Sequence, residues 1–222
     1  MHRSPIDRHE TRFALQMLRD QIQQRVYPVH RLDKPTSGLL VFGLSSEVAR
    51  VLAEQFSQRT IDKCYLAVVR GYCPEQGEIT HALRAKHDVY SDRRGAVEKT
   101  AQEALTTYRR LACVEWPEAV DRYPQTRYSL VELRPHTGRK HQLRRHMKHI
   151  GHPIIGDADH GKGVHNRFFA KRFACSRLLL ACTKLSFDHP VSGQRLTLEA
   201  SLGDEFLRVV EAFEWKGPAS NI

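Results

Sequence analysis

A single carboxylate, that of Asp33, lies between two basic residues in the segment His30–Phe42, whose sequence is HRLDKPTSGLLVF. Pro35 disfavours a helical conformation at the residue before it, and Gly38 permits backbone angles that other residues resist. Asp33 is therefore expected on a rigid turn that leads into a short buried strand over residues 39–43, a frequent position for a catalytic group. The alternative is that Asp33 only stabilises the turn, as most loop aspartates do. Spacing alone favours neither role.

A second group of polar residues lies in the segment Thr137–Ile150. Leu143, Met147 and Ile150 recur at helical spacing, which predicts a helix that begins near Gly138 and has one apolar face. The other faces carry basic residues, namely Arg139, Lys140, Arg144, Arg145 and Lys148, together with His141, His146 and His149. Free N–H groups and cations at the start of such a helix can bind a phosphate backbone. The alternative is a solvated basic helix, in which Leu143 belongs either to the core or to a pocket floor.

The histidines and aspartates between residues 141 and 160 could also be interpreted as a metal site. Zinc or a hydrolytic metal needs three or four ligands that converge in space. His146 and His149 share a helix face, but the sequence contains no H-E-x-x-H pattern. We therefore predict no metal site and expect residues 156–161 to form a loop. Residues 84–100, rich in charged side chains, are expected to form a second, exposed loop.

Four ordered segments together carry a family resemblance. HRLDKPTSGLLVF resembles the signature of the A-type rRNA and tRNA pseudouridine synthases (RluA-like). Lys63-Cys64-Tyr65, the run TGRKHQLR over Thr137–Arg144 and the run HPIIGD over His152–Asp157 fit the same family in the same order. The resemblance implies an isomerase that converts a uridine in structured RNA to pseudouridine. It also implies that no metal, nucleotide or redox cofactor takes part.

The resemblance assigns roles to particular residues. Asp33 would be the catalytic residue, and it would attack C6 of the base, attack C1′ of the ribose, or deprotonate the sugar. Arg139 would pair with Asp33, because a neighbouring guanidinium favours the ionised carboxylate. Tyr65 would stack on the base and assist removal of the C5 proton, and Arg31 would enter the space that the flipped base leaves. Further substrate-binding or supporting positions are His30, Lys140, Gln142, Leu143 and Arg144.

The target RNA is indicated by segments outside the catalytic motifs. The runs LRDQIQQRVYPVHRLDKPTSG and RYPQTRYSLVELRPHTGRKHQLRRHMKHIGHPIIGD resemble most the family members that modify uridine-65 of tRNA. A ribosomal RNA target, or a catalytically idle RNA-binding protein of the same fold, is the alternative. A metal-dependent hydrolase is a further alternative, built on His152, Asp157, Asp159 and His160.

The beginning of the chain departs from the family. Its first residues are MHRS, without the strand and N-K-P-x-G segment with which family members usually begin. We therefore expect one strand of the sheet to be missing, and a single catalytic domain over residues 1–222 without an S4-type RNA-binding domain.

Composition is consistent with an RNA partner. Lysine and arginine number 35 against 25 acidic residues, which gives a formal net charge of +10. Such a surface attracts phosphates and steers association. The sequence shows no membrane-spanning stretch and no signal peptide, and its five cysteines are odd in number without a C-x-x-C pair. We therefore expect a cytoplasmic, monomeric protein with reduced thiols that does not bind membranes.

Strands outnumber helices in the predicted order of elements and often follow one another directly, which favours an α+β fold with a long, mostly antiparallel mixed sheet. The resemblance adds flanking helices and a central catalytic cleft. Helices are predicted over residues 10–25, from Ser45 or Ser46 to about Phe56, and over Asp204–Phe213. Besides residues 39–43, the predicted strands are Cys64–Arg70, Leu105–Leu111, Tyr128–Leu133, Leu178–Phe187 and Arg195–Ala200.

Overall fold

The computed structural model describes residues 13–84 and 100–215. The helices in this part of the chain are α1 (Ala14–Ile22), α2 (Ser46–Gln58), α3 (Gln142–His149), α4 (Gly163–Phe173) and α5 (Asp204–Ala212). The strands are β1 (Tyr27–Pro28), β2 (Ser37–Gly38), β3 (Phe42–Gly43), β4 (Asp62–Arg70), β5 (Gln76–Thr80), β6 (Leu105–Trp116), β7 (Thr126–Pro135), β8 (Leu180–Asp188) and β9 (Arg195–Glu199).

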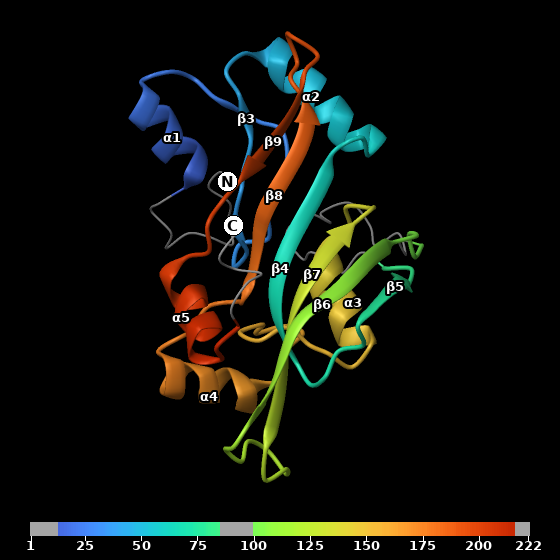
Figure 1. The fold of residues 1–222 in the computed structure, drawn as a ribbon. Helices are drawn as coiled ribbons and strands as arrows, with labels where there is room; N and C mark the ends of the chain where they lie inside the picture. Colours follow the sequence, from blue (N-terminus) through green and yellow to red (C-terminus); the bar gives the residue numbers. More distant parts are fainter. Residues whose placement is uncertain (1–12, 85–99, 216–222) are drawn as a thin grey trace, which may run out of the picture.

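A seven-stranded mixed sheet forms the centre of the molecule (Figure 1). Its strands follow the order β2-β8-β4-β7-β6-β5, and β9 also pairs with β8. β2 is parallel to β8, whereas the other pairs are antiparallel. A separate antiparallel pair joins β1 and β3. The predicted α+β class with a mostly antiparallel mixed sheet is thus confirmed.

The central strand β4 is apolar on both faces, and successive side chains on a strand point to opposite sides. Leu66 and Val68 pack in one cluster with apolar residues of α4 and α5. Ala67 and Val69 pack in another cluster with Leu143 of α3. Helices therefore cover the two faces of the sheet, with α3 on one side and α4 and α5 on the other (Figure 1).

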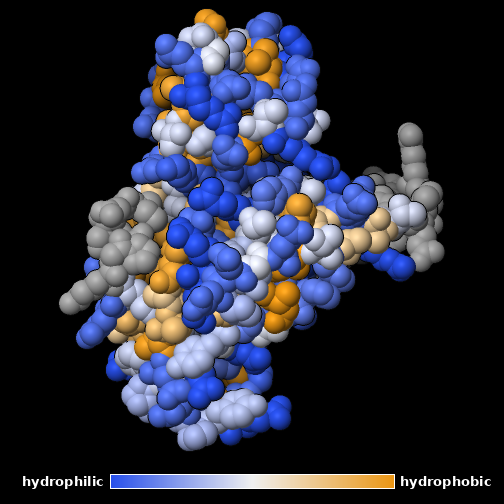
Figure 2. Space-filling model, turned by 45° about the vertical axis from the view of Figure 1, so that its right-hand side comes forward, coloured by the Kyte–Doolittle hydropathy of each residue, from blue (hydrophilic) through white to orange (hydrophobic). Residues whose placement is uncertain are grey.

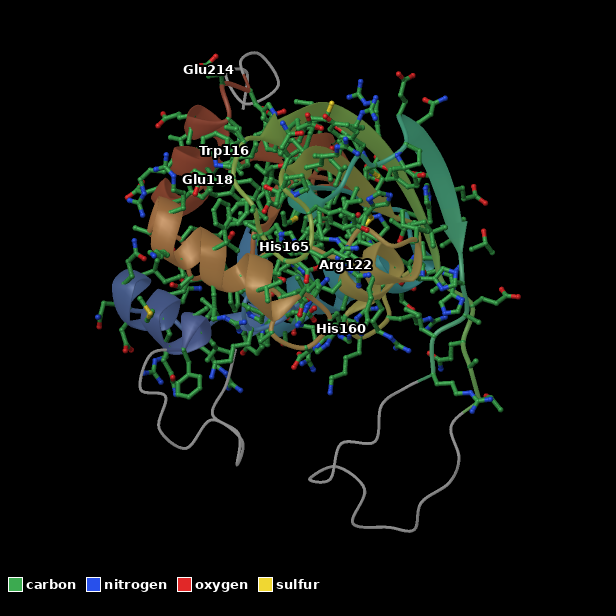
Figure 3. All side chains as sticks on the ribbon, turned by 90° about the horizontal axis from the view of Figure 1, so that it is seen from below. Trp116, Glu118, Arg122, His160, His165 and Glu214 are labelled. Atoms are coloured by element: carbon green, nitrogen blue, oxygen red, sulfur yellow. The ribbon has the colours of Figure 1, made fainter. Side chains whose placement is uncertain are left out.

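The long ribbon of β6 and β7 is fixed to α4 near its tip. Trp116 contacts the ring of Phe173 with 5.5 Å between centroids, and Arg172 donates a hydrogen bond of 2.8 Å to Glu118. Figure 3 shows Trp116 and Glu118 beside the helices of this face. The contacts hold the ribbon against the helical layer and leave the opposite face of the sheet to α3.

Several predicted elements differ from the structure. In place of the predicted strand over residues 39–43, the structure has the two-residue strands β2 and β3, and Gly38 at the end of β2 adopts a positive φ of 103°. The predicted helix start at Gly138 is wrong, since α3 begins at Gln142. β5 and α4 were not predicted. The loop expected over residues 84–100 falls almost entirely outside the described residues.

We expect Gly38→Ala to destabilise the protein. A Cβ at this position would lie 2.1 Å from the carbonyl oxygen of Cys182, and the positive φ disfavours any L side chain. Backbone strain of this kind costs about 1–3 kcal/mol before the steric clash is added. Urea unfolding of the variant should show at least that loss. An unchanged free energy of unfolding would mean that the β2–β8 contact contributes little to the fold.

Candidate active site

A cleft of about 780 Å³ opens on the α3 side of the sheet. Its walls come from the segment after β1, the end of α2, the start of β4 and the loop between β7 and α3. The cleft includes the predicted residues His30, Arg31, Asp33, Tyr65, Arg139, Lys140, Gln142 and Leu143. A second hollow of about 640 Å³, between α1 and β1, contains none of them. The structure therefore brings the predicted residues together from three separate segments, and the end of α2 completes the cleft.

Strand β8 positions Asp33 and Tyr65 from its two sides. Gly38, five residues after Asp33, is paired in parallel with Cys182, and Tyr65 of β4 is paired with the same residue in antiparallel register. Leu39 continues the contact by donating its backbone N–H to the carbonyl of Cys182 over 3.0 Å. The turn at Asp33 is closed by a hydrogen bond of 2.9 Å from the N–H of Thr36 to its carbonyl. Asp33 thus lies on a turn attached to the sheet, as predicted.

Arg144 is the cation that faces Asp33. Its Nη1 lies 3.5 Å from Asp33 Oδ2, and its side chain is 3% exposed against 22% for that of Asp33. Asp157 holds the same guanidinium in two hydrogen bonds of 2.7 Å, and Asp159 accepts a third of 2.9 Å. Asp157 is itself fixed, because its Oδ1 accepts the backbone N–H groups of Asp159 and His160.

The charges in this cluster stabilise each other. Burial alone would lower the pKa of Arg144, but the hydrogen bonds and charge of Asp157, with the charge of Asp33, raise it overall. Burial alone would raise the pKa of Asp157, yet its hydrogen bond with Arg144 brings the pKa below the ordinary value. The guanidinium and the buried carboxylate are therefore both ionised at neutral pH.

The predicted pairing of Arg139 with Asp33 needs correction. Within the described part of the chain, the ion pair to Asp33 comes from Arg144. Arg139 instead donates its Nε to the carbonyl of Glu103 over 3.1 Å and lies in the wall of the cleft. Both arginines belong to the same motif, and the start of α3 at Gln142 places the second of them toward Asp33. A contact of Arg139 with RNA stays a prediction.

Gln142 supports the loop that carries Arg139 and Lys140. Its Oε1 accepts the Thr137 hydroxyl over 2.7 Å and the N–H of Arg139 over 3.0 Å. Its Nε2 donates to the carbonyl of Leu105 over 2.9 Å. Gln142 therefore acts from a buried position as a support for the loop. Leu143 is buried in the core and also lines the cleft, so both interpretations of this residue apply.

Tyr65 lies at the base of the cleft as a neutral phenol. Burial is the largest cause of its strongly raised pKa, and the neighbouring Cys182 and Asp33 raise it further. Cys182 is the register partner of Tyr65 on β8, and Tyr65 packs against the cluster that contains it. A protonated phenol favours stacking and hydrogen bonding over proton abstraction as the role of this ring.

His30 supports the turn from behind. Its Nε2 accepts the backbone N–H of Val41 over 3.0 Å, and its ring stacks on Phe56 with 4.4 Å between centroids. Burial, and secondly the charge of Lys63, lower the pKa of His30 to about 4. The imidazole of His30 is thus neutral at neutral pH and supports the turn through its hydrogen bond and its ring contact. Arg31 is exposed and lines the cleft.

A group of three possible metal ligands lies beside the site. Atoms of His141, Asp159 and His160 approach within 4.8 Å of one another. The two rings share a hydrogen bond of 3.0 Å, and the Asp159 carboxylate already accepts from Arg144. A guanidinium at this distance repels a divalent cation, so the arrangement fits a hydrogen-bond network better than a metal site. Figure 3 shows His160 on the loop before α4.

The hydrolase alternative fails on geometry. Three of its four proposed ligands are already engaged elsewhere. Asp157 and Asp159 are bound to Arg144, and the Nδ1 of His152 hydrogen-bonds with the carbonyl of Arg70.

Comparisons with known proteins agree with this site. The sequence pattern of the RNA pseudouridylate synthase family matches residues 1–149. The chain is 49% identical to tRNA pseudouridine synthase C of Vibrio parahaemolyticus over 97% of this chain and 87% of that protein. It is 50% identical to the protein of the same name from Yersinia pestis, over 100% and 86%. Among solved structures, human RNA Pseudouridylate Synthase Domain Containing 1 superposes with a TM-score of 0.67 at 27% identity, covering 88% of this chain and 75% of that one.

The fold and the cleft with its aspartate, tyrosine and arginine thus define an RNA-modifying isomerase. The chain belongs to the RNA pseudouridylate synthase family. Among the described residues, no helix is long and apolar enough to cross a membrane.

We expect Asp157→Asn to cost about 3 kcal/mol in the free energy of unfolding. Removing one partner of a buried ion pair leaves the other charge uncompensated. The matched control is Asp159→Asn, whose side chain is 55% exposed and contacts the same guanidinium. This control should cost less than about 1 kcal/mol. Urea unfolding of both variants measures the difference, and equal losses would contradict the central place of Asp157.

The low pKa of His30 makes stability depend on pH. The unfolded chain binds a proton at this residue near pH 6.5, whereas the folded protein does so only near pH 4. Unfolding therefore takes up a proton between these values, and stability falls as the pH is lowered through them, by up to about 1.4 kcal/mol per pH unit. Urea unfolding at pH 7.5 and pH 5 should show a smaller loss for His30→Gln than for the wild type. The same pH dependence in both proteins would contradict this.

Proposed function

We propose that this protein converts a uridine of tRNA, uridine-65, to pseudouridine, with Asp33 as the catalytic residue. The observation that carries the proposal is the half-exposed carboxylate of Asp33, held against the buried Arg144 inside a cleft rich in cations. The choice of tRNA over ribosomal RNA is supported by relatives whose sequences are 49% and 50% identical to nearly the whole chain, and these relatives are named as tRNA enzymes. An idle RNA-binding protein would not need this ion pair.

The substrate uridine leaves its stack before it reacts. Flipping a nucleotide costs a few kcal/mol, which contacts in the pocket must offset. The ring of Tyr65 and the side chain of Leu143 supply an apolar surface in the cleft on which the uracil stacks. Arg31 is exposed and lines the cleft, which supports the proposal that it fills the gap in the RNA.

The reaction exchanges one bond for another without a net change in composition. The N1–C1′ bond breaks, the uracil turns, and a C5–C1′ bond forms while C5 loses a proton and N1 gains one. Asp33 begins the sequence by attack at C6, by attack at C1′, or by removing a ribose proton. Arg144 keeps the carboxylate oriented in all three routes, because it is itself fixed by Asp157.

The C5 proton needs an acceptor other than a tyrosinate. Because the pKa of Tyr65 is strongly raised, its hydroxyl keeps its own proton. We therefore assign the proton to a water molecule in the cleft, with the Tyr65 hydroxyl as a hydrogen-bond partner of that water.

The proposed setting is the cytoplasm, with the protein as a monomer. All five cysteines are free, four of them buried. Free thiols are the usual state in a reducing compartment.

We expect Asp33→Asn to lower isomerisation at least about 10³-fold, because a neutral amide can neither attack nor accept a proton. Release of tritium from tRNA labelled at C5 of uridine measures the reaction. The affinity of the variant for tRNA should stay within a few fold of the wild type. Loss of activity and affinity together would show that Asp33 is structural, and full activity would refute the mechanism.

Mapping of the modified nucleotide in transcripts of tRNA and ribosomal RNA tests the target. Pseudouridine at position 65 of tRNA is the expected result. Modification of ribosomal RNA alone would replace the tRNA proposal with its alternative.

A further inference from the structure

Two cations stand together on the wall of the cleft formed by the end of α2 and the start of β4. We call this surface the α2–β4 wall and define it by Arg59 and Lys63, with His30 behind them. Lys63 and Tyr65 are both on β4, and both line the cleft. Lys63 therefore lies on the same side of the sheet as the ring proposed to stack on the uracil.

Among the described residues, the ammonium group of Lys63 has no acidic partner. Its side chain is half-buried, and burial is the largest cause of its lowered pKa, to which the charge of Arg59 adds. Among the described residues, the side chains of Lys63 and Arg59 form no hydrogen bond and no ion pair. The adjacent carboxylate of Asp62 is engaged by Arg195 over 2.5 Å.

The other ionisable groups of the cleft do not compensate these cations. Asp33 is paired with Arg144. The Cys182 thiol beside Lys63 favours its charged form, but burial outweighs this effect and the pKa of Lys63 is lowered overall. Burial also raises the pKa of Cys182 to about 11, so its thiol is neutral and carries no counter-charge. His30 stays neutral, partly because Lys63 itself disfavours its protonation. Lys63 is a half-buried cation with the exposed cation of Arg59 close by, and this arrangement raises the energy of the free protein. A bound anion would remove that cost.

We propose that Lys63 and Arg59 form a binding subsite for a phosphodiester group of the RNA, next to the nucleotide that enters the cleft. The identification of the anion as RNA depends on the proposed function. The anion site itself depends only on the two cations of the α2–β4 wall. The compact ammonium of Lys63 suits a phosphate oxygen, and the guanidinium of Arg59 can bind two oxygens of one phosphate. A contact with an uncharged base edge would not neutralise either cation.

The backbone at Arg59 gives a variant that separates binding from folding. Arg59 follows the last residue of α2 with a φ of 62°, a left-handed conformation in which glycine is favoured. Arg59→Gly should therefore remove the charge and relieve the backbone together. Lys63→Met removes a half-buried cation without a partner, so it should not lower the melting temperature either.

The experiment measures the affinity of the full chain for unmodified tRNA over a range of KCl concentrations, in the Asp33→Asn background so that no turnover occurs. Each phosphate contact contributes about 0.7–0.9 to the slope of log Kd against log salt. Lys63→Met and Arg59→Gly should each weaken binding about tenfold at low salt and reduce the slope by about that amount. Lys63→Arg should keep the wild-type slope. The matched control is Lys171→Met, on the exposed surface of α4 across the sheet, which should change neither quantity.

The outcomes distinguish the subsite from its alternatives. An unchanged slope with Lys63→Met overturns the proposal, whether or not the affinity falls, because a base contact or a steric effect would then explain the loss. A lowered melting temperature, with equal loss of affinity in Lys63→Met and Lys63→Arg, would show a structural role and also overturn it. If the wild type releases no tritium from tRNA while the slopes change as expected, the proposed function falls and the phosphate subsite stands.

Discussion

The guanidinium of Arg144 lies among three carboxylates and joins parts of the chain that are far apart in sequence. Asp33 comes from the turn after β1, Arg144 from α3, and Asp157 from the loop before α4. A buried charge is tolerated only when its partners satisfy it fully, since an uncompensated one costs several kcal/mol. The three segments are therefore held in one arrangement. The position of the Asp33 carboxylate follows from this cluster and not from the turn alone.

A second constraint acts from the sheet. Cys182 of β8 is the register partner of Gly38 on one side and of Tyr65 on the other. Close approach of β2 to β8 requires the missing Cβ at Gly38, and buried apolar pairs fix the register of β4. The tyrosine ring and the aspartate turn thus share one reference strand. The face of the molecule that Figure 2 shows is mostly hydrophilic, with hydrophobic patches between the hydrophilic residues.

The features that the sequence predicts well have local causes. The turn at Asp33, the Ser45 cap of α2 and the β8–β9 hairpin each depend on a few neighbouring residues. The start of α3 does not, because Gln142 holds the preceding loop through contacts with the distant Leu105. α4 also lacks a side-chain cap that would mark its beginning. Which arginine of the motif faces Asp33 depends on that helix start, and the resemblance indicated Arg139 where the structure pairs Arg144 with Asp33.

The cation beside Asp33 and the cations that line the cleft differ in how far their electric field extends. The charge of Arg144 is cancelled nearby by carboxylates in a buried setting, so it contributes little to the attraction of distant phosphates and is screened little by salt. Arg31, Arg59 and Lys63 have no such partners among the described residues and line the cleft. Their field extends into solvent, where ions screen it within about 10 Å at 0.1 M salt. Salt should therefore act on the capture of RNA and leave the geometry of the Asp33 carboxylate unchanged.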